Sequence, residues 1–123
     1  MVGYSDFLVL ARNLMQAIKE RRDTVEIRTS ISRSYCYTFH YIRENLRGHR
    51  EAHFKDGTSD HQEAVNIFHR IGKHTLASKV WGLYDARNRA DYGLKEYFDK
   101  ADAEDCIREA EDIVAEVKKI RIV

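Results

Sequence analysis

The sequence contains no proline, and only 6 of its 123 residues are glycine. Proline breaks helices and glycine weakens them, so a chain that is poor in both favours long, uninterrupted helices. The length is typical of one domain built around one hydrophobic core. We therefore predict a single helical domain over residues 1–123.

Apolar residues recur at helical spacing in five segments, and no segment shows the alternation of a strand. The first helix is expected to follow Ser5, a good N-cap residue, and to run up to the charged residues 19–23. Its apolar positions are Phe7, Leu10, Ala11, Leu14 and Ile18. The second helix is expected between a Thr24 cap and Gly48. Its apolar stripe consists of Ile31, Tyr35, Phe39, Ile42 and Leu46.

A third helix is predicted after the polar residues 49–58, which are typical of a loop. Ser59 and Gln62 have the spacing of a capping box, and Gly72 is the expected end of the helix. The apolar positions between these signals are Ala64, Val65, Phe68 and Ile71.

The two remaining helices fill the C-terminal part of the chain. Thr75 can cap the fourth, and the fifth is expected to begin near Asp99 or Asp102. The fifth carries the stripe Cys106, Ala110, Ile113, Val117 and Ile120. Each of the five helices has an apolar face that needs a partner. The predicted fold is therefore an all-α, antiparallel up-and-down bundle of about five helices.

Lysine plus arginine total 21 and aspartate plus glutamate total 20, which gives a net charge near +1. This balance gives no overall attraction to nucleic acid or membrane, so any basic patch must be local. No apolar run approaches the roughly 20 residues that span a bilayer, and the N-terminal residues lack a signal-peptide pattern. We expect a cytoplasmic protein with no membrane contact, in which Cys36 and Cys106 are reduced and buried.

The stretch YDARNRADYG, residues 84–93, places several charged side chains within a helical pattern. Arg87 falls on the apolar stripe of the fourth helix, which consists of Leu76, Val80, Leu83 and Ala90. An arginine facing other helices needs a carboxylate or a phosphate, and Asp91 lies within reach on the same face. Two readings stay open. Arg87 either bonds to a carboxylate of another helix and ties the bundle together, or it binds an anion together with Asn88.

Two segments resemble HEPN-domain proteins. Residues 29–45, TSISRSYCYTFHYIREN, are similar to the family's R-x-Y-Y-x-x-F-H helix. Residues 86–107 contain RNRADY followed by FDKADAE, which resembles the R-N-R-A-D-Y and F-D-K-x-x-A-E stretches of small stand-alone HEPN proteins. The similarity spans residues 24–118 with both motifs in the family's order.

The resemblance implies a five-helix bundle that forms a homodimer and acts on RNA. Many HEPN proteins are metal-independent endoribonucleases, and often they are toxins paired with a small nucleotidyltransferase antitoxin. In the family's motif an arginine is followed by a polar residue and then by a histidine. Here Arg87 and Asn88 match the first two positions, and Tyr92 stands where the histidine is expected. The resemblance assigns Arg87, Asn88 and Tyr92 to the catalytic site.

A tyrosine, with a pKa of about 10, is a poor base at neutral pH, whereas a histidine, with a pKa of about 6.5, is a good one. A Tyr92 site is expected to be slow or to borrow a histidine. His40 shares a helix face with Arg33 and is one candidate; it is otherwise a partly buried ring bonded to the backbone. Arg33, His40, Arg87 and Arg89 are the predicted phosphate-binding residues.

His49 and His53 are four residues apart, but HREAH lacks the arrangement of the zinc motif H-E-x-x-H and has no evident third ligand. We expect neither a metal nor a cofactor. The resemblance also makes Tyr92 a candidate for nucleotidylation, because some HEPN toxins are silenced on a tyrosine beside the motif. The alternative function is a non-catalytic interaction module that binds a nucleotidyltransferase partner or a nucleotide.

Overall fold

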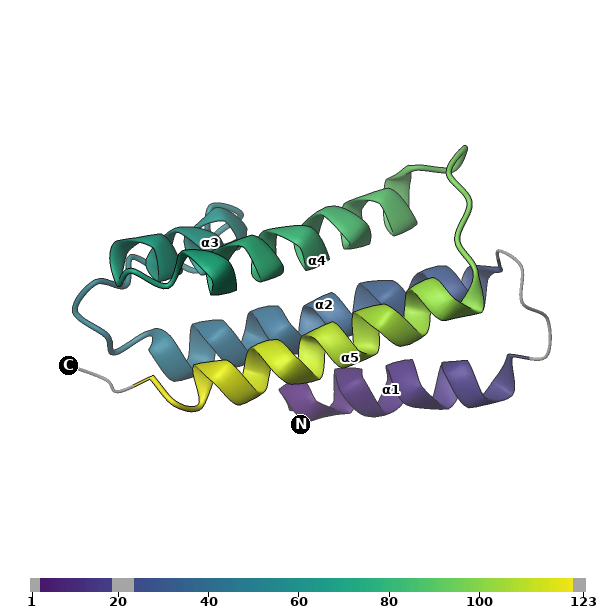
Figure 1. The fold of residues 1–123 in the computed structure, drawn as a ribbon, viewed down its shortest axis with the longest axis horizontal. Coiled ribbons are helices and arrows are strands. Elements are labelled where there is room, and N and C mark those ends of the chain that lie inside the picture. Colours follow the sequence, from purple (N-terminus) through teal and green to yellow (C-terminus); the bar gives the residue numbers. More distant parts are fainter. Residues whose placement is uncertain (1–2, 19–23, 121–123) are drawn as a thin grey trace.

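A computed structural model describes residues 3–18 and 24–120 of the chain. Over these residues the protein has five helices and no strand, so the all-α prediction is confirmed (Figure 1). The helices are α1 (Tyr4–Ala17), α2 (Val25–Leu46), α3 (Asp60–Arg70), α4 (His74–Tyr92) and α5 (Lys100–Val117). The charged residues 19–23, where the first helix was expected to end, lie outside the described residues.

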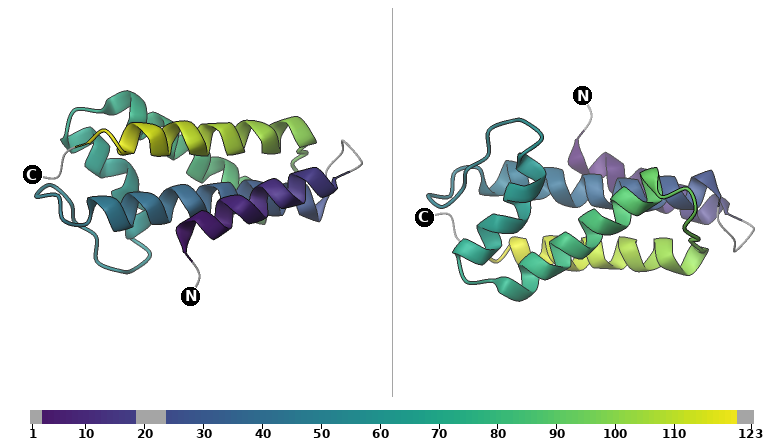
Figure 2. Two further views of the ribbon diagram at one scale, coloured as in Figure 1. Left: turned by 90° about the horizontal axis from the view of Figure 1, so that it is seen from below. Right: turned by 90° about the horizontal axis from the view of Figure 1, so that it is seen from above.

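Helix α2 lies at the centre of the bundle and contacts the other four helices. Helices α1 and α4 run opposite to α2, whereas α5 runs beside α2 in the same direction (Figures 1 and 2). The four long helices therefore alternate in direction along the chain, as expected of an up-and-down bundle. The short α3 crosses one end of α2 obliquely and packs mainly on α4 (Figure 2).

The stripes predicted for the longest helices form the core. All five apolar positions predicted for the second helix are buried on α2, namely Ile31, Tyr35, Phe39, Ile42 and Leu46. On α4 the buried positions are Leu76, Ala77, Val80, Leu83 and Ala90, and Arg87 lies on the same line. Because the apolar stripes of α2 and α4 are both buried, the rotation of α4 about its own axis is fixed. This rotation determines which polar side chains of α4 face α2.

Two of the predicted helix caps are present. The Thr24 hydroxyl accepts a hydrogen bond from the Ile27 backbone N–H at 3.2 Å. Asp99 and Asp102 form a reciprocal capping box at the start of α5, in which each carboxylate accepts the backbone N–H of the other residue at 2.9 Å. These bonds satisfy donors that a helix start otherwise leaves unpaired.

The start of α1 differs from the prediction. The helix begins at Tyr4 with Gly3 as its N-cap, so Ser5 is not the cap. The Asp6 carboxylate accepts the Gly3 N–H at 2.9 Å, which fixes the helix start two residues earlier than predicted. The buried face is also shifted, because Leu10 is 42% exposed. The residues that face the core are Leu8, Ala11, Met15 and Ile18.

Helix α3 begins after Ser59, as predicted, but the predicted capping box is not formed. Ser59 makes no side-chain cap bond, and the Gln62 amide donates to Asn66 instead. Helix α4 begins after Lys73, so Thr75 lies inside the helix. The loop before α3 is held by Asp60, whose fully buried carboxylate accepts two backbone N–H groups.

The end of α4 is fixed by a cation from α2. Arg28 donates to the backbone oxygens of Ala90 and Gly93, each at 3.1 Å, and its guanidinium lies 5.1 Å from the centre of the Phe98 ring. At Gly93 a Cβ would lie 2.7 Å from the Arg89 backbone oxygen, so a larger residue does not fit there. This end of α4 carries the RNRADY stretch, which is therefore held rigidly against α2.

Both cysteines are free. Burial raises the pKa of the Cys106 thiol to about 12, and the nearby Asp102 and Asp105 raise it further, so this thiol stays protonated. Within residues 3–18 and 24–120, no helix combines the length and the apolar character that crossing a membrane requires.

Candidate functional site

Arg87 lies where α4 faces α2, as its place on the apolar stripe predicts, and its side chain is 23% exposed. Its Nε is 2.9 Å from Asp91 Oδ2, although the N–H is not directed at this oxygen and makes no hydrogen bond. The Asp91 carboxylate accepts a hydrogen bond from the Ser32 hydroxyl at 3.2 Å. The guanidinium lies 5.8 Å from the centre of the Tyr35 ring. Arg87 is thus oriented by its own helix and by α2.

The carboxylate that pairs with Arg87 belongs to the same helix. Among the described residues, Arg87 therefore does not form the predicted bond to a carboxylate of another helix. Arg87 Nη1 donates to the Asn88 side-chain oxygen at 3.2 Å, which brings the two motif residues together. Among the described residues, Nη2 donates no hydrogen bond. The arginine therefore keeps hydrogen-bonding capacity for a ligand.

The structure adds a histidine that sequence reasoning missed. His61, in the first turn of α3, packs its ring against Phe39 at 4.2 Å and against Tyr84 at 5.5 Å between ring centres. Its Nδ1 lies 2.6 Å from the Tyr35 hydroxyl. These contacts join α2, α3 and α4 beside Arg87.

The environment of His61 favours its neutral form. Burial lowers its pKa below the ordinary value, and the positive charges of Arg87 and Arg43 lower it further, against an opposing effect of Asp60. As the pH rises, His61 therefore loses its positive charge at a lower pH than a free histidine does.

The predicted phosphate-binding residues of α2 lie near this cluster. Arg33 and His40 both pack on Phe7, at 6.0 Å and 5.2 Å from its ring centre. His40 Nδ1 lies 3.2 Å from Arg43 Nη2, and burial followed by the charge of Arg43 lowers the pKa of His40. The Arg43 guanidinium in turn lies 5.0 Å from the ring of Phe39, the same ring that supports His61.

Five side chains therefore follow one another across the surface of α2, α3 and α4, and aromatic rings lie between them. We call this set the basic strip. It consists of Arg33, His40, Arg43, His61 and Arg87. Tyr35 and Phe39 are themselves buried, so these two rings support the partly exposed cations and do not face solvent.

Three predicted residues are not part of the strip: Asn88, which bonds to Arg87, and the more distant Arg89 and Tyr92. Arg89 donates to Asp85 at 3.0 Å and lies 3.8 Å from Glu96, and in the described residues no ring contact joins it to a member of the strip. Tyr92 is 73% exposed, and no contact joins it to Arg87 in the described residues. With Asn88 and the start of the following loop, Tyr92 lines a shallow hollow of about 610 Å³. The structure therefore unites Arg87 with Asn88 but places Tyr92 on another face of α4.

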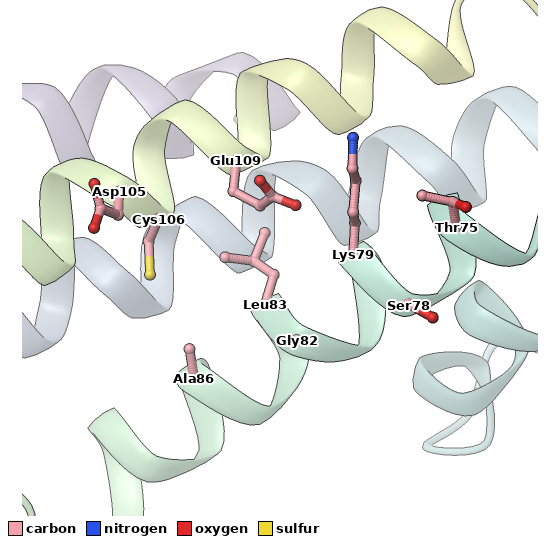
Figure 3. Close-up of a pocket in the computed structure, with 9 residues that line it drawn as sticks. All are labelled: Thr75, Ser78, Lys79, Gly82, Leu83, Ala86, Asp105, Cys106 and Glu109. Carbon is pink, nitrogen blue, oxygen red and sulfur yellow. The ribbon is translucent and has the colours of Figure 1, made fainter.

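A groove of about 480 Å³ separates part of α4 from α5 (Figure 3). Leu83, Ala86 and Cys106 give it an apolar floor, and the carboxylates of Asp105 and Glu109 lie on its α5 side. These acids repel phosphate, and the Cys106 thiol is protonated and so a poor nucleophile. Lys79 also lines the groove, but its ammonium group donates to Glu116 at 3.1 Å.

The HREAH segment does not form a metal site. His49 Nδ1 accepts the Glu51 backbone N–H at 3.0 Å. In residues 3–18 and 24–120, no three histidine, cysteine, aspartate or glutamate side chains are grouped to hold a metal ion.

Comparison with protein families and known proteins adds no relative. No family model, no curated protein and no solved structure matches the chain. The function must therefore be argued from the geometry of the strip.

Proposed function

We propose that the protein is a metal-independent endoribonuclease of the HEPN type and that the basic strip binds the RNA backbone. The observation that supports this most is the pairing of Arg87 and Asn88 beside the neutral imidazole of His61. The Nη2 group of Arg87, which donates no hydrogen bond in the described residues, suits a phosphate oxygen as a charge-assisted donor. The RNRADY and F-H motifs of the HEPN resemblance fall on the helices that build this strip.

RNA cleavage at such a site needs no metal ion in principle. A guanidinium can stabilise the negative charge that develops on the phosphorane, because it donates hydrogen bonds from a fixed position. Side chains can also carry the proton transfers. Single-stranded RNA is the expected substrate, because its backbone can adapt to the strip more readily than that of a duplex.

A homodimer is part of this proposal. Two large apolar side chains are strongly exposed outside the strip, namely Val25 at 77% and Leu94 at 81%. A second copy that covers them would bring two basic strips into one particle. Light scattering at micromolar concentration should give the mass of a dimer, and a monomer would remove this part of the proposal.

We expect the purified protein to cleave single-stranded RNA in the presence of EDTA, at a rate that added magnesium does not raise. The reason is that the charge of Arg87 replaces that of a metal ion. The measurement is the decay of a labelled oligonucleotide on a denaturing gel. Cleavage that stops in EDTA and returns with magnesium would overturn the proposed mechanism.

The exposure of Tyr92 supports a second function, as a non-catalytic interaction module that binds a nucleotidyltransferase partner or a nucleotide. A phenol that is 73% exposed can be reached by another enzyme. Its adduct would add bulk and negative charge beside Asn88, and so repel RNA. This also makes nucleotidylation of Tyr92 a means of silencing the nuclease.

After incubation with a cognate nucleotidyltransferase and ATP, mass spectrometry should find AMP on Tyr92, and Tyr92→Phe should escape modification. Tyr97→Phe is the matched control, because Tyr97 is a similarly exposed phenol five residues further on. This variant should still be modified. AMP on another residue would contradict the assignment.

A further inference from the structure

We propose that His61 is the catalytic base of this site and that Tyr35 positions it. The proposal rests on the ribonuclease function above and names the group that takes the place of the missing motif histidine. His61 comes from α3, a different helix from Arg87. The tertiary structure therefore supplies the histidine that the sequence motif lacks.

The ring of His61 is held in one orientation. It stacks on Phe39 and Tyr84, and its Nδ1 is engaged by the Tyr35 hydroxyl at 2.6 Å. Its Nε2 makes no hydrogen bond within residues 3–18 and 24–120, and it is not one of the buried side-chain atoms that lack a partner. The free nitrogen is therefore the one that can meet a substrate.

Tyr35 suits both protonation states of this histidine. Burial raises the pKa of its phenol well above the ordinary value, so the hydroxyl stays neutral. A neutral hydroxyl can accept the Nδ1–H bond whether Nε2 is free or protonated. Tyr35 can thus keep the ring in place while Nε2 gains and loses a proton.

The titratable side chains around His61 come from three helices. They are Tyr35, His40 and Arg43 of α2, Asp60 of α3, and Tyr84 and Arg87 of α4. The two arginines and burial outweigh Asp60, so the imidazole is neutral at neutral pH and can accept a proton. The positive charges of the two arginines also favour the approach of an RNA phosphate.

The step that follows is an internal transesterification. The ribose 2′-hydroxyl gives its proton to Nε2 of His61, and the 2′-oxygen forms a bond to phosphorus. The bond between phosphorus and the 5′-oxygen breaks, and this oxygen takes a proton from water. The imidazolium then returns its proton to the hydroxide left behind. The products are a 2′,3′-cyclic phosphate and a 5′-hydroxyl end, with no change in oxidation state.

The other candidates fit this role less well. His40 has its Nδ1 against Arg43 and packs on Phe7, and no contact joins it to Arg87 among the described residues. Tyr92 lies on another face of α4. His61 is the candidate that shares Tyr35 with Arg87, because Tyr35 contacts both of them.

The test compares cleavage of single-stranded RNA by the wild-type protein and by His61→Gln. We expect the rate to fall at least about 100-fold, the usual contribution of a general base, while affinity for an uncleavable 2′-deoxy oligonucleotide changes less than about threefold. His53→Gln replaces an exposed histidine and should cleave normally. Helical circular dichroism checks that each variant is folded.

Two further readouts separate catalysis from structure. Imidazole added to His61→Ala should restore part of the rate, and Tyr35→Phe should lower kcat with little change in KM. An unchanged rate in His61→Gln, with an active wild-type protein, would overturn the role of His61 but leave the ribonuclease function intact. If the wild-type protein cleaves no RNA, the function and this inference both fail.

Discussion

Replacing Arg87 by glutamine should reduce RNA cleavage at least about 100-fold, the scale expected when one donor to a developing oxyanion is lost. The substitution removes the charge and the free Nη2, which faces no partner in the described residues. Asp91 keeps its hydrogen bond from Ser32, and the pair it loses is partly exposed, so the free energy of unfolding should fall by only about 1 kcal/mol.

Arg89→Gln is the matched control, because it changes the same residue type two positions away on α4. The charge of Arg89 is balanced by Asp85 and Glu96, so we expect the rate to change less than about threefold. The measurement is the single-turnover rate with excess protein. Equal losses in the two variants would show that charge on α4, rather than the placement of Arg87, supports cleavage.

Asp60→Ala should lower the free energy of unfolding by about 2–4 kcal/mol, the largest stability effect that we expect from a polar residue of this chain. The Asp60 side chain is fully buried and accepts the backbone N–H groups of Lys55 and Asp56 at 2.8 Å and 3.0 Å. Alanine leaves both donors without this partner. It also removes the carboxylate that lies 3.7 Å from Arg43.

Asp105→Ala is the control for this loss, because the Asp105 side chain is 64% exposed and pairs with Arg108 on the surface. It should cost less than about 1 kcal/mol. Urea unfolding followed by circular dichroism measures both changes. Equal effects in the two variants would contradict the role assigned to the buried carboxylate. Because Asp60 precedes His61, its variant should also cleave RNA more slowly.

The parts of the fold that the sequence predicts well are those set by local chemistry. The α2 stripe has five apolar positions at steps of four and three, and all five are buried, although the central position of α2 also buries residues off the stripe, such as Tyr37 and Tyr41. The caps at Thr24 and Asp99 depend on residues within one turn. In α1, by contrast, leucines occupy two neighbouring faces. Packing against α2 decides between these faces, and the local spacing does not.

The candidate site divides in the same way. Arg87 and Asn88 are neighbours in the chain, so a motif can reveal them together. His61 meets Tyr35 across a separation of 26 residues, and no spacing rule connects them. A histidine among polar residues just after a helix start is also common on protein surfaces, so nothing in the local sequence marks it. Its role becomes visible only when α3 is placed across α2 and α4.

The most direct test of the account is the chemistry of the RNA ends. The wild-type protein in EDTA is incubated with an oligonucleotide and with the same oligonucleotide carrying a 2′-deoxy group at the cleaved position. Mass spectrometry should find a 2′,3′-cyclic phosphate and a 5′-hydroxyl end from the first, and an intact second. Cleavage of the deoxy substrate, or fragments ending in a 5′-phosphate, would contradict attack by the 2′-hydroxyl at the Arg87 and His61 site.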